Sequence, residues 1–168
     1  MSRMAIRSSV LAGLGLAALA LAGCSHDDKR AALTLTEAPQ FGLFFNDQGE
    51  SASLAYGEAN SDNVSLMLQC AKGTGEVQVS DIARSEKAPA LLLASGGAKS
   101  ELGARVESLE IGPQLLVADT TADAAALKGF RRTGRLTVGQ GDASYGVSAS
   151  GRERAEVDLF FTACGQSA

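Results

Sequence analysis

Hydrophobic and polar residues alternate in short runs along most of the chain beyond residue 40. Val64, Leu66 and Leu68, for example, share one side of an extended segment, whereas Ser65 and Gln69 fall on the other side. Alternation with a period of two, interrupted by glycine-rich turns about every 8–12 residues, is typical of antiparallel strands. The pattern predicts strands over 41–45, 53–56, 64–70, 77–79, 90–95, 102–107, 115–118, 136–138 and 145–149.

Clusters of polar residues and glycine separate these segments. Residues 46–49, Asn-Asp-Gln-Gly, follow the apolar run that ends at Phe45, and residues 72–75, Lys-Gly-Thr-Gly, follow the segment that ends at Cys70. Asparagine, aspartate and glycine favour turns because they tolerate unusual backbone angles or bond to their own backbone. We therefore expect the chain to reverse direction at both places.

The period changes to that of a helix in the segment after residue 118. Leu127 and Phe130 lie on one helical face, and Gly134 follows at the position where glycine often ends a helix. The threonines at 120–121 offer hydroxyl groups that could cap its first turn. The segment therefore predicts a helix over about 121–132.

A second helix is predicted at the C-terminal end of the sequence. Four apolar residues between 157 and 164 are spaced as i, i+3, i+4 and i+7, and Ser150 with Glu153 has the spacing of a capping box. This favours a helix over about 151–164, although a strand over 155–164 is the alternative. The whole pattern predicts an α+β domain, a mostly antiparallel sheet of about 7–9 short strands with two short helices.

The first 23 residues differ in character from the rest. Arg3 and Arg7 precede an apolar run, Val10 to Leu21, that is only 12 residues long. A helix that spans a bilayer needs about 20 apolar residues, so this run is too short to be a membrane anchor. A basic start, a short apolar run and small residues after it are typical of a cleavable export signal.

The end of this signal, Leu21-Ala22-Gly23-Cys24, resembles the lipobox of bacterial lipoproteins. The resemblance implies cleavage between Gly23 and Cys24 and attachment of a diacylglycerol to Cys24, which would anchor the protein in the membrane. By the enterobacterial sorting rule, Ser25 at the next position implies transfer to the outer membrane, with the domain facing the periplasm. An ordinary secretory signal followed by a chance cysteine is the alternative.

Removing residues 1–23 leaves 145 residues, a size that suits one domain with a hydrophobic core. Residues 24–32 are highly charged and are predicted to be a flexible tether, and residues 33–168 a single globular α+β domain. The remaining chain has 13 basic and 19 acidic residues, a formal charge of −6. This negative charge argues against nucleic acid and against an anionic lipid surface as partners.

Two cysteines remain once Cys24 carries the lipid, namely Cys70 and Cys164. An exported chain reaches an oxidising compartment, so these two are predicted to form a disulfide. A metal or redox pair is the alternative, but the two cysteines are not in a CxxC motif and have no histidine nearby in sequence.

The only histidine, His26, lies in the predicted tether. Catalytic triads and most transition-metal sites need a histidine that is held in a pocket. We therefore expect no triad, no zinc hydrolase chemistry, no metal and no cofactor. The cluster of Asn46, Asp47 and Glu50 could ligate Ca²⁺, but it lacks the ligand order of an EF-hand and fits a solvated turn better.

Ser61-Asp62-Asn63 and Lys72-Gly73-Thr74-Gly75 look like two elements of penicillin-recognising enzymes. The nucleophilic S-x-x-K motif is missing after residue 23, and the two elements lie close together in the sequence. Turns explain both segments better than a catalytic site does.

The residues therefore favour a membrane-anchored, non-enzymatic binding or scaffolding domain that recognises an envelope protein or small ligand through loops or a sheet edge. The segments 130–134 and 160–164 are similar to small uncharacterised envelope proteins of alphaproteobacteria, a resemblance that implies no activity. The alternatives are a cell-envelope hydrolase that uses carboxylates or a Ser–Lys pair, and an inhibitor of hydrolases. A deep pocket with converging acids would favour the enzyme, and an exposed edge the binder.

Overall fold

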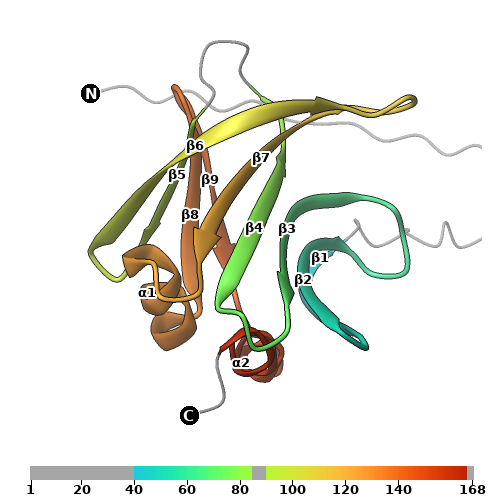
Figure 1. Ribbon diagram of the computed structural model, residues 1–168. Helices are drawn as coiled ribbons and strands as arrows, with labels where there is room; N and C mark the ends of the chain where they lie inside the picture. Colours follow the sequence, from blue (N-terminus) through green and yellow to red (C-terminus); the bar gives the residue numbers. More distant parts are fainter. Residues whose placement is uncertain (1–39, 85–89, 166–168) are drawn as a thin grey trace, which may run out of the picture. The chain divides into compact units, whose positions relative to one another are not determined.

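The computed structural model describes residues 40–84 and 90–165, all within the compact unit Glu37–Ala168 (Figure 1). The predicted signal, the tether, Gly23, Cys24 and His26 lie outside the described residues. Within residues 40–84 and 90–165, neither helix has the length and apolar character that crossing a bilayer requires.

The described residues form nine strands and two helices, which confirms the prediction of a mostly antiparallel sheet with two helices. The strands are hydrogen-bonded in the order β1-β2-β3-β4-β7-β6-β5-β8-β9, and every pair is antiparallel. In chain order the elements are β1 (Phe41–Gln48), β2 (Ser51–Glu58), β3 (Val64–Ala71), β4 (Glu76–Ile82), β5 (Ala90–Ser95), β6 (Ala98–Ser108), β7 (Gln114–Thr121), α1 (Ala125–Thr133), β8 (Arg135–Gln140), β9 (Ala143–Ser148) and α2 (Glu153–Cys164).

The long strand β6 joins the two halves of this sheet. Its first part, up to Gly103, pairs with β5, and its second part, from Ala104 onward, pairs with β7. Because one strand serves two neighbours in succession, the sheet curves into a half-barrel (Figure 1). The curvature brings β8 and β9 toward the end of β4, although four strands in the sheet order separate β9 from β4.

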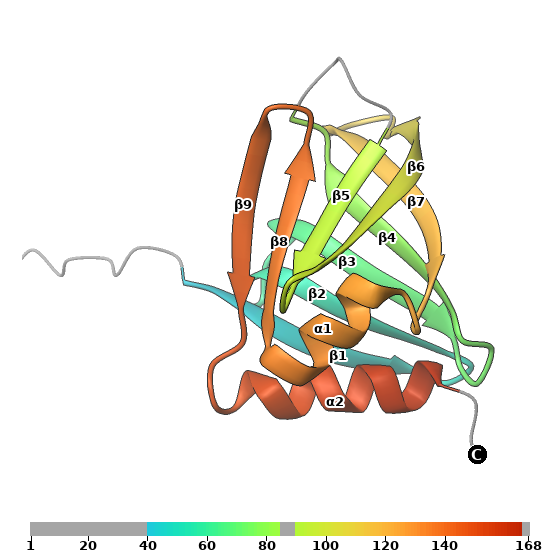
Figure 2. The same cartoon turned by 90° about the vertical axis from the view of Figure 1, so that its left-hand side faces the viewer.

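The concave face of the sheet and the two helices enclose the hydrophobic core. Leu127 and Phe130 of α1 are fully buried, and so are Val157 and Phe160 of α2. Helix α1 packs against β5, β6 and β8, whereas α2 packs against β1 and β2 (Figure 2). The sheet contributes alternate residues of each strand, as the period of two predicts, among them Leu43, Leu54, Leu66, Leu68, Val77, Val79, Leu91, Leu93, Leu116, Leu136, Val138 and Val147.

The predicted start of the first helix is wrong. Thr120 and Thr121 do not cap α1 but extend β7, since they pair with Val77 and Glu76 of β4. The helix begins only at Ala125 and has no side-chain cap. The sheet register therefore overrides the local capping signal, while the predicted end at Gly134, with φ of +68°, is correct.

The C-terminal segment forms a helix, as predicted, and not the alternative strand. Helix α2 starts at Glu153, two residues later than expected, and the Ser150 N–H donates to the Glu153 carboxylate at 2.6 Å.

The predicted turn at 46–49 is displaced by two residues. Asn46 and Asp47 still pair with Ser53 and Ala52, so β1 continues through Gln48. The chain reverses at Gly49, whose φ of +77° suits glycine. Pairing between β1 and β2 therefore outweighs the preference of Asn46 and Asp47 for a turn.

Candidate functional site

The sheet is open, so it has two edge strands, β1 and β9, and helix α2 covers the first of them. The Leu43 N–H donates to Glu153 Oε1 at 2.8 Å, and the Phe45 N–H donates to Glu156 Oε2 at 3.2 Å. Both glutamates come from the side of α2 that lies against β1. The two carboxylates therefore occupy backbone donors that would otherwise be free to pair with another strand.

Gly42 makes room for this contact. A Cβ atom at residue 42 would lie 2.8 Å from Glu153 Oε1, too close for the carboxylate to keep its position. Burial by itself raises the pKa of Glu153, but the hydrogen bonds from Ser150 and from the Leu43 N–H outweigh it, and the pKa is lowered overall. The charged form of Glu153 is therefore the one that closes the β1 edge.

No residue in the described ranges covers the edge of β9 in this way. The Ala149 N–H donates to the Gly134 carbonyl, and the regular pairing with β8 continues from there toward the two-residue turn at 141–142. In antiparallel pairing, successive residues point their backbone groups to opposite sides. The N–H and C=O groups of Ser144, Gly146 and Ser148 therefore point away from β8, and no described residue bonds to them.

The composition of β9 does not protect this edge either. Natural edge strands usually carry lysine, proline or a bulge that prevents pairing with another chain. The sequence of β9, Ala-Ser-Tyr-Gly-Val-Ser, contains no charge and no proline, and its register with β8 is regular. Ser144, Gly146 and Ser148 are exposed and small, so a further strand could approach the edge closely. We call these three residues and their backbone groups the β9 edge.

An aromatic cluster lies beside the β9 edge on the concave face. The rings of Tyr145 in β9 and Tyr56 in β2 are stacked with centroids 6.5 Å apart, and Phe41 in β1 lies 5.5 Å from Tyr56. Both tyrosines are half-buried, and Phe41 is 37% exposed. This cluster spans the space between the two edge strands and offers apolar ring surface to a segment that adds to β9.

A fully buried carboxylate, that of Asp81 at the end of β4, holds this cluster in place. Asp81 Oδ1 accepts hydrogen bonds from the Tyr145 hydroxyl and from Arg84 Nη1, each at 2.7 Å. Asp81 Oδ2 accepts from the Gln140 side-chain amide, which also donates to the Ile82 carbonyl. The guanidinium of Arg84 lies 4.2 Å from the centre of the Tyr145 ring. These contacts fix the β8–β9 hairpin against the end of β4.

The charges and hydrogen bonds of this network keep Tyr145 and Arg84 protonated. Burial and the nearby negative charge of Asp81 raise the pKa of the Tyr145 hydroxyl, so it stays protonated and donates. Burial lowers the pKa of Arg84, but the bond to Asp81 more than offsets this effect, and the pKa is raised overall. Asp81 accepts three hydrogen bonds from side chains, so its carboxylate links β4 to the β8–β9 hairpin.

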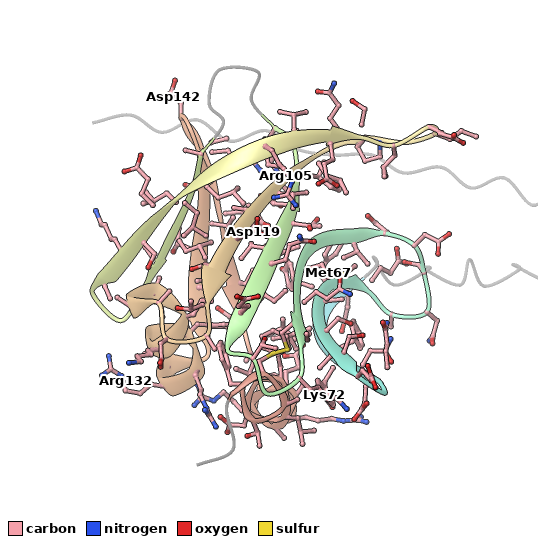
Figure 3. All side chains as sticks on the ribbon, viewed as in Figure 1. Met67, Lys72, Arg105, Asp119, Arg132 and Asp142 are labelled. Carbon is pink, nitrogen blue, oxygen red and sulfur yellow. A yellow bond between two sulfur atoms is a disulfide. The ribbon has the colours of Figure 1, made fainter. Side chains whose placement is uncertain are left out.

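A groove runs over β3, β4 and β7 and has a volume of about 710 Å³. It is open and is lined by polar residues that include Gln78 and Asp119. Hydrogen bonds from Gln78 and Arg105 lower the pKa of Asp119, whereas a general acid needs a raised carboxyl pKa (Figure 3). Asp119 in this groove therefore does not have the raised pKa that a general acid needs.

Comparison of the chain with protein-family models, with curated proteins and with solved structures finds no significant match.

The structure places some of the predicted residues together. Cys70 at the end of β3 and Cys164 at the end of α2 are joined by a disulfide, with Cα atoms 5.7 Å apart. Ser61-Asp62-Asn63 and Lys72-Gly73-Thr74-Gly75, in contrast, lie at opposite ends of the eight-residue strand β3, so they do not form one site. The Asn63 N–H donates to the Ser61 hydroxyl oxygen, so these residues bond within their own turn.

The carboxylate of Asp47 accepts hydrogen bonds from the Lys72 ammonium and from the Gly49 N–H. Over the described ranges, no group of three or more histidine, cysteine or acidic side chains is close enough to hold a metal ion.

The sequence pattern alone does not identify the network of Asp81, Arg84, Gln140 and Tyr145. Two of its members can be recognised as inward-facing polar residues. Asp81 follows Val77 and Val79 at the next inward position of β4, and Gln140 follows Leu136 and Val138 in β8. A polar residue that continues an inward-facing series indicates a buried hydrogen-bond network.

Proposed function

We propose that this chain is a lipid-anchored protein of the cell envelope whose domain binds an extended segment of another envelope protein on the β9 edge. The lipobox resemblance at Cys24 supports anchorage, with the domain at the periplasmic face of the outer membrane. The contrast between the two sheet edges supports the binding role and is the observation that carries it. Helix α2 occupies the donors of β1, whereas the outward groups of β9 have no described partner.

The physical basis of binding would be the addition of a tenth strand. Backbone N–H and C=O groups of Ser144, Gly146 and Ser148 would pair with the backbone of the incoming segment. Alternate side chains of that segment would face the ring surfaces of Tyr145, Tyr56 and Phe41, which would supply apolar contact. The Asp81 network keeps Tyr145 in position before binding, so less conformational freedom is lost when the segment docks.

A pair of variants at Gly146 tests the proposal. Gly146→Pro removes the outward N–H and leaves the bonds to β8 intact, because proline is tolerated where the N–H of an edge strand faces solvent. Gly146→Ala is the matched control, since it keeps the N–H and its Cβ meets nothing within 4 Å. A photo-reactive amino acid at Ser144 in the full-length protein records contacts in intact cells.

The proposal predicts a defined cross-link to one envelope protein that Gly146→Ala keeps and Gly146→Pro abolishes. Equal cross-linking in both variants would show that the edge does not carry binding. A cross-link between two copies of this chain would identify self-association as the use of the edge and would overturn the proposed partner.

A further inference from the structure

Four arginines come from the segments that meet at Gly134, where the Ala149 N–H after β9 bonds to the Gly134 carbonyl shortly before α2 begins. Arg154 Nη2 donates to the Arg132 carbonyl at 2.9 Å, and a Cβ at residue 134 would lie 2.5 Å from Arg154 Nη1. Arg135 begins β8, directly after Gly134, and Arg152 precedes the first turn of α2. We call Arg132, Arg135, Arg152 and Arg154 the arginine group.

None of these arginines forms an ion pair among the residues that the structure describes. The acids nearby are already engaged. Glu153 accepts from Ser150 and Leu43, Glu156 accepts from Phe45, and Asp158 pairs with Arg131. A chain whose formal charge is −4 thus carries a local surplus of positive charge at this place. Since salt screens charges beyond about 8 Å, a ligand here senses the arginine group more than the net charge.

The arginine group lies at one end of the β9 edge. Arg135 is directly opposite Ser148, the last residue of β9, and both are exposed on the outer face. Asp142 marks the other end of the same hairpin, at the top of the molecule, whereas Arg132 points outward near the bottom (Figure 3). Ser148 is small, so it leaves the space between Arg135 and a further strand open.

We propose that the segment bound on the β9 edge carries acidic side chains at the end that reaches Ser148, where the arginine group receives them. This inference rests on the proposed function and specifies the chemistry of its partner. Guanidinium groups bind carboxylates through paired, charge-assisted hydrogen bonds, and arginine holds them more specifically than lysine does. The position of the arginines at one end of the strand also fixes the direction in which the segment docks.

A library of random peptides displayed on phage tests this chemistry with the intact mature chain as target. Peptides are selected on the native protein and counter-selected on the Gly146→Pro variant, which leaves binders of the β9 edge. We expect aspartate and glutamate to be enriched at one end of the selected peptides. We also expect binding to weaken about tenfold in the Arg135→Gln, Arg152→Gln double variant, with a steep dependence on salt.

Arg105→Gln is the control for loss of positive charge elsewhere, because it removes one charge from β6, in the upper part of the molecule (Figure 3). If the selected peptides need Gly146 but show no acidic end and bind the double variant equally, the partner chemistry is wrong and the edge proposal stands. If no selected peptide distinguishes the native protein from Gly146→Pro, the edge proposal itself fails.

Discussion

At the scale of single residues, the Asp81 network is the main departure from a purely apolar core. Asp81 has no solvent exposure, and every buried side-chain polar atom among the described residues has a hydrogen-bond partner. A buried carboxylate is tolerated only when its hydrogen bonds replace those to water. Arg84, Gln140 and Tyr145 supply these hydrogen bonds. The bond from the Tyr145 hydroxyl also fixes the Tyr145 ring beside the β9 edge.

Replacing Tyr145 with phenylalanine should reveal this network through its pH dependence. The folded pKa of Tyr145 is raised, so above about pH 10 the unfolded chain loses this proton while the folded chain retains it. The free energy of unfolding should therefore fall with rising pH, by up to about 1.4 kcal/mol per pH unit for this group. Tyr145→Phe should cost about 1–2 kcal/mol at pH 7 and should weaken the alkaline decline.

Urea unfolding followed between pH 7 and about pH 11 measures both effects. An alkaline decline of equal slope in the native protein and in Tyr145→Phe would contradict the assignment of this proton to Tyr145.

At the scale of secondary structure, α2 has two tasks, one in the core and one at the sheet edge. Phe160 and Phe161 fill the core, and the glutamates one and two turns earlier in the helix face β1. The disulfide at Cys164 ties the far end of the helix to β3. The helix thus closes the β1 edge without adding a strand.

Glu153→Gln should remove part of the acid sensitivity of the fold. The folded pKa of Glu153 is lowered, so its contribution to stability is present above about pH 4.3 and is lost as the pH falls through the folded pKa. Thermal unfolding between pH 7 and about pH 3 should show a smaller decline for this variant than for the native protein. Glu50→Gln, which removes the same charge from the exposed β1–β2 turn, is the control. Identical acid profiles for Glu153→Gln and the native protein would mean that the carboxylate does not cover β1.

Replacing both Cys70 and Cys164 with serine should lower the free energy of unfolding by about 2–4 kcal/mol, because the bond closes a long loop in the unfolded chain. Denaturant titration of the native and variant proteins gives this difference. Mass analysis of unreduced protein from the envelope gives the pairing directly, and two free thiols there would rule it out.

The elements themselves could largely be predicted from the sequence, because local periodicity determines them. All nine strands and both helices occupy segments whose apolar spacing predicts their type. The errors lie at ends where pairing with a distant strand decides the outcome. Thr120 and Thr121 look like helix caps, but β4 holds them in the sheet, and Asn46 looks like a turn residue, but Ser53 pairs with it.

At the scale of the whole molecule, the candidate site could not be predicted, since it depends on strand order. The β9 edge is open because β8 and β5 lie on its other side and no further strand of the described residues pairs with it. Asp81 bonds to Gln140 and Tyr145, which lie 59 and 64 residues further along the chain. The curvature of the sheet brings them together. Two cysteines in a chain whose first residues predict export are, by contrast, enough to predict their pairing without knowledge of the fold.

The proposed anchorage through Cys24 belongs to this scale too, because it would determine where in the cell the domain acts. Cys24→Ala should abolish labelling by radioactive palmitate and should leave the protein unanchored or retained with an uncut signal. Fractionation of labelled cells measures both outcomes, with Cys70→Ala as the control cysteine. Persistent palmitate on membrane-bound Cys24→Ala protein would disprove the lipoprotein proposal.

Amide hydrogen exchange at the two sheet edges tests the central claim most directly. The account predicts rapid exchange at Ser144, Gly146 and Ser148, whose N–H groups point away from β8, and slow exchange at Leu43 and Phe45, whose N–H groups donate to α2. Tyr145 and Val147, which bond to β8, provide the internal reference within the same strand. Slow exchange at Gly146 in the isolated protein, equal to that at Tyr145, would show that the β9 edge is already covered and would contradict the account.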